Sequence, residues 1–165
     1  MRGMLFAALA AVLLASPAFA APPLPQTNDM TMEACYFKDG EQVEEKEFPS
    51  RFRQQAAELN QWLARELSAA GGFSVKSVPC NFKEYATGNE LKVAVLHLTD
   101  SNGAWLVKVF AKRAPEKGDE VNLFPISTML MVAPGNSPSE EKVNGYIERM
   151  SKFTLELIRR FQSAG

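Results

Sequence analysis

The chain has 165 residues, of which 46% are hydrophobic, 22% charged and 10% aromatic. This balance excludes an intrinsically disordered chain, and two cysteines are too few for a small disulfide-rich scaffold. Eighteen Lys and Arg residues against nineteen Asp and Glu residues give a formal charge of −1, so the sequence carries no basic footprint for nucleic acid. We therefore expect a globular protein with no nucleic-acid partner.

Residues 1–20 have the three parts of a secretory signal peptide. Arg2 precedes an alanine-rich apolar run, and Ala18 and Ala20 place small residues before a cleavage point. The apolar run is too short to span a bilayer, and no later segment is long enough to do so. We expect cleavage after Ala20, a periplasmic or secreted location in a bacterium, and no transmembrane segment in the mature protein.

The mature protein would consist of a leader and one domain. Residues 21–29 contain three prolines and no hydrophobic periodicity, which predicts a flexible leader. Residues 30–165 have the length of a single domain. In an oxidising compartment an even number of cysteines favours a disulfide, and the wide separation of Cys35 and Cys80 differs from the spacing of a redox pair. We predict a structural Cys35–Cys80 bridge.

The domain is expected to begin with two strands. Residues 30–38 and 41–48 flank Asp39-Gly40, which is a strong signal for a two-residue turn. Carboxylates in the second segment could suggest a cation site, but the sequence offers no other oxygen ligand nearby. We interpret these carboxylates as a solvated strand edge: Glu44, Glu45 and Glu47.

A helix follows, with Ser50 as the expected N-cap and Gly71-Gly72 as the stop. Its apolar residues recur at steps of three and four, so one face requires burial. These residues are Phe52, Ala56, Leu59, Leu63, Leu67 and Ala70. Residues 73–78 then predict a strand, which the disulfide would tie to the first strand.

Residues 91–99 and 104–112 predict a β-hairpin around a turn in which Gly103 takes a left-handed conformation. In that register His97 faces Val107, and one set of alternating residues forms a core face. The set comprises Leu91, Val93, Val95, His97, Trp105, Val107, Val109 and Ala111.

The opposite face of this hairpin is more apolar than a solvated sheet face requires. Exposed apolar residues inside a charged rim often mark an interaction site, so this face is the candidate partner-binding site. It carries Leu96, Leu98, Leu106 and Phe110, ringed by Lys92, Lys108 and Lys112. The alternative is that the N-terminal hairpin or the loop of residues 113–120 folds over it.

Residues 121–132 predict a last strand, which Pro125 confines to an edge or interrupts. This edge is a second possible pairing site for a partner. A basic amphipathic helix should start near Pro138, with Ser137 as its cap, and pack on the sheet. The alternative is that this helix lies on a membrane surface. The order predicts an α+β fold: a mainly antiparallel sheet of four to six strands with two amphipathic helices packed on one face.

The sequence contains no recognisable catalytic, nucleotide-binding or metal-binding motif. His97 is the only histidine, and its place on the core face favours a structural role. We therefore expect no cofactor, no metal and a non-enzymatic binding or accessory protein that acts on an envelope component or another exported protein. One alternative is an inhibitor or immunity protein that neutralises a toxin or hydrolase. A lower-ranked alternative is a hydrolase with an unrecognised carboxylate site.

Overall fold

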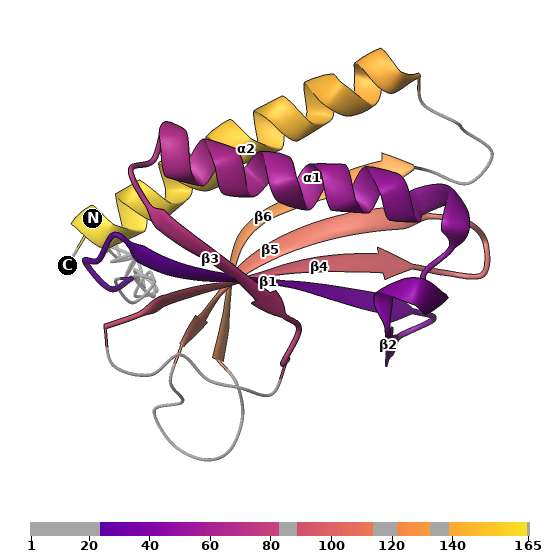
Figure 1. Cartoon of the computed structure of the whole chain (residues 1–165), viewed down its shortest axis with the longest axis horizontal. Helices are drawn as coiled ribbons and strands as arrows, with labels where there is room; N and C mark the ends of the chain where they lie inside the picture. The colour runs from indigo at the N-terminus through magenta and orange to yellow at the C-terminus, as the bar shows by residue number, and fades with distance from the viewer. Residues whose placement is uncertain (1–23, 83–88, 114–121, 133–138, 165) are drawn as a thin grey trace, which may run out of the picture.

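The computed structural model describes residues 24–82, 89–113, 122–132 and 139–164 (Figure 1). Six strands form one mixed sheet, and two helices pack on it, which confirms the predicted α+β class. In chain order the elements are β1 (Asp29–Lys38), β2 (Glu41–Val43), the short 3-10 helix η1 (Glu45–Glu47), α1 (Ser50–Ala69), β3 (Ser74–Pro79), β4 (Leu91–Thr99), β5 (Trp105–Arg113), β6 (Asn122–Val132) and α2 (Glu140–Ser163).

The sheet has the strand order β2-β1-β4-β5-β6, and β3 also pairs with β1. Strands β4, β5 and β6 form an antiparallel meander, whereas β1 runs parallel to both β3 and β4. The connection through α1 returns the chain beside β1 in the same direction, as a parallel crossover requires. Three of the five described strand pairings are antiparallel, so the sheet is mixed.

Both helices lie on the same side of the sheet (Figure 1). They bury their apolar stripes against the predicted core face of the hairpin, all of whose residues are fully buried. The stripe of α1 comprises Phe52, Ala56, Leu59, Leu63 and Leu67. Among the described residues, neither helix combines the length and the apolar character that crossing a membrane demands.

The β4–β5 hairpin has the predicted register. Lys92 lies opposite Lys112, and Thr99 lies opposite Trp105. Gly103 has a φ of +90°, and the carboxylate of Asp100 closes the turn by accepting a bond of 2.9 Å from the backbone N–H of residue 104. Alternating hydrophobicity and turn chemistry together determine this register.

Strand β6 lies at the end of the described strand order, as Pro125 indicated. Pro125 pairs with Phe110 immediately after a register shift in the β5–β6 ladder. A proline has no N–H to donate, and an edge strand with a local irregularity accommodates this loss.

Three boundaries differ from the sequence prediction. Pro49, rather than Ser50, is the N-cap residue of α1, and α2 begins at Glu140 after Ser139, with the predicted cap Ser137 outside the described residues. The second strand is shorter than expected, because the chain turns into η1 directly after it. There the backbone N–H of Glu44 donates to the Glu47 carboxylate at 3.3 Å, a local bond that competes with strand pairing.

The predicted signal peptide lies outside the described residues, but the end of the predicted leader is described. Leu24 is only 2% exposed, and its N–H donates to the carbonyl oxygen of Phe161 at 3.0 Å. The Gln162 amide donates to the carbonyl oxygens of Pro25 and Thr27 at 2.8 and 2.9 Å. From Leu24 onward, the segment expected to be flexible is therefore docked on α2.

Candidate functional site

The sheet face turned away from the helices, here called the second face, contains the candidate site. Its side chains come from alternate residues of β1, β4 and β5, which the strand registers align across the sheet. They are Thr31, Glu33, Cys35, Phe37, Lys92, Ala94, Leu96, Leu98, Leu106, Lys108, Phe110 and Lys112.

All seven residues of the predicted partner-binding face lie on the second face, but they do not form an apolar centre with an exposed lysine rim. Lys92 is 5% exposed and Lys112 is 2% exposed, so two of the three rim lysines are buried. Leu96 is also buried, whereas the remaining four residues are partly exposed. The second face thus has a closed part and an open part.

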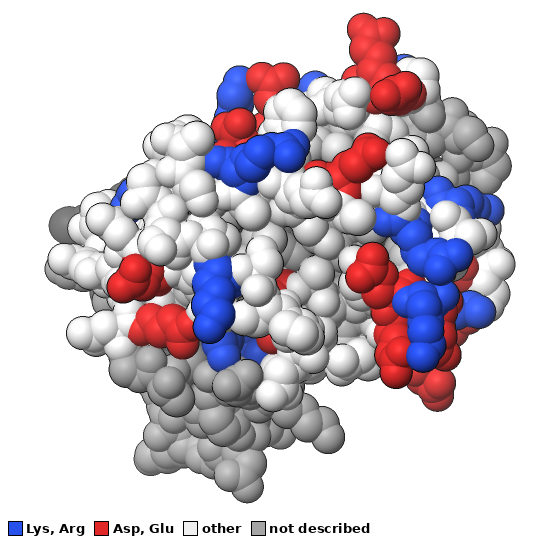
Figure 2. Space-filling view, in the orientation of Figure 1, with Lys and Arg blue, Asp and Glu red and all other residues white. Residues whose placement is uncertain are grey.

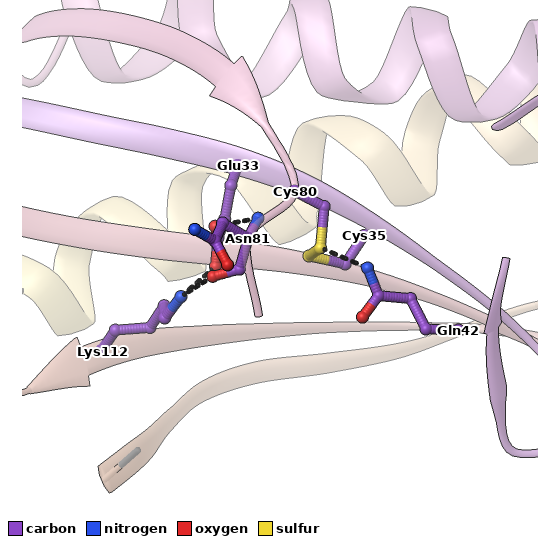
Figure 3. A network of polar contacts seen from close by, with 6 residues as sticks. All are labelled: Glu33, Cys35, Gln42, Cys80, Asn81 and Lys112. Carbon is purple, nitrogen blue, oxygen red and sulfur yellow. Dashed lines mark hydrogen bonds and ion pairs between the residues drawn. A yellow bond between two sulfur atoms is a disulfide. The ribbon is translucent and has the colours of Figure 1, made fainter. Parts of the chain in front are cut away.

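The closed part contains a buried ion pair. The Lys112 ammonium lies 2.5 Å from the Glu33 carboxylate, and both side chains are almost completely buried (Figure 3). Lys112 also donates to the carbonyl oxygen of Asn81 at 2.8 Å, and the N–H of Asn81 donates to Glu33 at 3.0 Å. Burying two charges is costly unless they are paired and hydrogen-bonded, and this arrangement meets that condition.

Residues 80–82, here called the strap, cover the closed part. Cys80 forms the predicted disulfide with Cys35, with a Cα–Cα distance of 5.0 Å. The Phe82 ring packs edge-on against Phe37 with a centroid distance of 5.5 Å. The strap therefore holds the second face through a covalent bond, an ion-pair network and an aromatic contact. The sequence suggested two other covers, the N-terminal hairpin and the loop of residues 113–120, and residues 114–120 of that loop lie outside the described residues.

The open part, here called the apolar patch, consists of partly exposed residues around one lysine. They are Phe37, Leu98, Leu106 and Phe110, with Lys108 on the same face of β5. Within the described ranges, no carboxylate pairs with the Lys108 ammonium. Within the described residues, the patch therefore combines apolar surface with one lysine that pairs with no carboxylate.

A pocket of about 590 Å³, here called the acidic pocket, opens beside the disulfide. Figure 2 shows carboxylates, mixed with basic side chains, gathered where β2 and η1 lie in Figure 1. The amide of Gln42 donates to the sulfur of Cys80 at 3.4 Å (Figure 3). The pocket is lined by Ala34, Tyr36, Gln42, Val43, Glu44, Glu45, Glu47, Pro79 and Cys80.

The three carboxylates interpreted as a solvated strand edge are exposed, and the structure brings them to one pocket. Sequence spacing alone could not place them beside Cys80, since β3 reaches β1 only through the crossover. Burial, followed by the charge of Glu45, raises the pKa of Tyr36 to about 12, so its hydroxyl keeps its proton at neutral pH.

His97 is completely buried on the helix-covered face, as predicted. Its ring stacks on Tyr36 with a centroid distance of 5.1 Å, and its Nε2 lies 2.9 Å from the Asn60 side-chain oxygen. Burial lowers the pKa of His97 to about 3, which keeps the ring neutral. A neutral histidine inside the core cannot reach a substrate or bind a metal at the surface.

One group of potential metal ligands consists of Glu33, Cys35 and Cys80, whose ligand atoms lie within 4.8 Å of one another. Both sulfurs belong to the disulfide, and the Glu33 carboxylate is bound to Lys112. Thiolates, rather than disulfide sulfurs, bind metals, so this group offers no ligand set in its oxidised form.

No protein-family model matches the chain, and no curated protein matches it. A solved structure described as "Crystal structure of uncharacterized protein" aligns with a TM-score of 0.35 and 13% sequence identity, over 84% of this chain and 95% of that chain. A likeness at this level supports no inference about function, so the site has to be interpreted from its own chemistry.

Proposed function

We propose that this protein is a small exported, non-enzymatic binding protein that holds another exported protein through the apolar patch. The observation that carries the proposal is the combination of partly exposed Leu98, Leu106 and Phe110 with the ammonium of Lys108, which pairs with no carboxylate among the described residues. Such a surface fits an apolar segment of a partner protein that presents a carboxylate to Lys108.

The fixed geometry of the sheet supports a binding role. The strap is held by the disulfide and by the Glu33–Lys112 network, so the apolar patch lies beside a part of the second face that is already closed. A preorganised surface loses little conformational entropy when a partner binds. The described surface presents neither an imidazole base nor a free thiol, because His97 is buried and both cysteines form the disulfide, and this supports binding over catalysis.

The proposed location is the periplasm or the extracellular medium. The segment of residues 1–20 has the pattern of a signal peptide, and the Cys35–Cys80 disulfide belongs to the chemistry of oxidising compartments. An accessory protein of the cell envelope and an inhibitor of a toxin or hydrolase would both use such a surface. The identity of the bound partner separates these two cases.

Site-specific photo-crosslinking in cells tests the proposal. A photoreactive residue at Leu106 should give a discrete adduct, and the same residue at Ser77, which is exposed on β3, should give none. Phe110→Asp should abolish the adduct while the protein keeps its fold, because a partly exposed position tolerates a charge.

Phe153→Asp is the matched control, since Phe153 is a 51% exposed aromatic residue on α2, away from the second face. This variant should retain the adduct. The absence of any adduct from Leu106, or an adduct that survives Phe110→Asp in a folded protein, would remove the apolar patch as the binding site. Mass spectrometry of the adduct identifies the partner as an envelope protein, a toxin or a hydrolase.

A further inference from the structure

The two cysteines of the disulfide differ in their exposure to solvent. Cys35 is completely buried, whereas Cys80 is partly exposed and lines the acidic pocket. Thiol–disulfide exchange begins when a thiolate attacks one sulfur, and access decides which sulfur is attacked. An attacking thiolate that enters the acidic pocket meets Cys80, and Cys35 then becomes the leaving group.

We propose that Cys80 is a site of thiol–disulfide exchange for dithiol donors that carry no negative charge near their thiols. The proposal goes beyond the binding function above and does not depend on it. It rests on the unequal exposure of the two cysteines and on the carboxylates that line the pocket beside Cys80.

The exchange is balanced in two steps. A donor thiolate attacks Cys80, forms a mixed disulfide with it and releases Cys35, which takes a proton from the donor's second thiol. That second sulfur, now a thiolate, attacks the donor sulfur of the mixed disulfide and releases Cys80, which is protonated from water. The donor is oxidised to a cyclic disulfide, and Cys35 and Cys80 are both reduced to thiols.

The buried position of Cys35 selects dithiols over monothiols. After the first attack the Cys35 thiol remains beside the mixed disulfide at Cys80, where it can attack and restore the original bridge. A monothiol is therefore expelled, whereas the second thiol of a dithiol completes the reduction.

The acidic pocket favours donors that carry no carboxylate. Glu44, Glu45 and Glu47 line it, and Lys46, which pairs with Glu44 at 2.6 Å, is not among the lining residues. The net negative charge repels a donor that carries a carboxylate in addition to its thiolate, and salt screens this repulsion.

Dihydrolipoamide and dihydrolipoate provide a matched pair of probes, because they share the same two thiols and differ by one carboxylate. For the purified protein at low ionic strength, we expect dihydrolipoamide to reduce the bridge several-fold faster, on the order of threefold to tenfold. The rate should rise in proportion to the concentration of the donor. High salt should bring the two rates together.

The triple variant Glu44→Gln/Glu45→Gln/Glu47→Gln should lose most of the difference between the two donors. The control variant Glu140→Gln/Glu141→Gln/Glu156→Gln removes the same number of charges from exposed positions on α2 and should retain it. Equal rates for the two donors at low salt, or an equal loss of the difference in both variants, would overturn attack through the acidic pocket. A rate independent of donor concentration would show that reduction requires prior unfolding, and it would overturn the proposal without any variant.

Discussion

The two faces of the sheet are closed by different means. The helix-covered face is sealed by many apolar side chains of α1, α2 and the strands, and full burial of a large one contributes about 1.5–3 kcal/mol. Among the described residues, the second face is sealed at one end, by the disulfide, the Glu33–Lys112 pair and Phe82. The stabilising contacts are therefore spread over many side chains on the helix-covered face and concentrated in a few on the second face.

This difference supports the proposed binding function. A face closed by two helices has no surface left for a partner, whereas a face closed at one end by a strap leaves the apolar patch beside it. Among the described residues, residues 80–82 cover the closed part, and the disulfide and the Glu33–Lys112 network hold them in place.

A large effect is expected when the ion pair loses one of its two charges. Lys112→Met leaves the Glu33 carboxylate buried beside Cys35 without a cation, which should lower the free energy of unfolding by about 3–5 kcal/mol. Urea unfolding followed by circular dichroism measures this loss.

The double variant Glu33→Gln/Lys112→Met is the control for the ion pair. It removes both charges and keeps an oxygen that can accept the Asn81 N–H, so it should recover most of the lost stability. If Lys112→Met unfolds at the same urea concentration as the unchanged protein, the closed part of the second face does not depend on this pair.

A smaller effect on the helix-covered face is expected from acid. The pKa of His97 is about 3 in the folded protein against an ordinary value of 6.5, so below pH 6.5 the unfolded chain takes up a proton that the folded protein excludes. The stabilisation is complete above pH 6.5 and is lost as the pH falls toward 3. Between pH 7 and pH 5 the loss should be about 2 kcal/mol.

His97→Gln isolates the contribution of His97 to the pH dependence of stability, because the variant keeps a polar side chain but has no group that titrates there. Its free energy of unfolding should fall between pH 7 and pH 5 by about 2 kcal/mol less than that of the unchanged protein. Parallel pH profiles for the two proteins would contradict the buried, neutral state of His97.

The sequence predicted the parts of the fold that local patterns determine. The 91–99 and 104–112 hairpin, its register and its two faces follow from alternation and from the turn at Gly103. The parallel pairing of β1 with β4 could not be predicted, because no local pattern brings two strands together across such a long connection.

On the second face, side-chain partners that lie far apart in the sequence could not be predicted either. A lysine in a strand usually faces water, and Lys112 is buried only because Glu33 lies 79 residues earlier in the chain. The strap was not predicted, since Asn81 acts through its backbone and Phe82 belongs to no periodic pattern. The partners of these residues are fixed by tertiary structure alone.

Adjacent residues of β5 allow the two faces to be compared most directly. Val107 is fully buried on the helix-covered face, and Leu106 is partly exposed in the apolar patch. Thermal and urea unfolding of Val107→Asp and Leu106→Asp therefore test whether the second face is open there. We expect Val107→Asp to lose more than about 4 kcal/mol or to fail to fold, and Leu106→Asp to lose about 1 kcal/mol. A Leu106→Asp variant as unstable as Val107→Asp would mean that the apolar patch is core, and it would contradict the proposed binding surface.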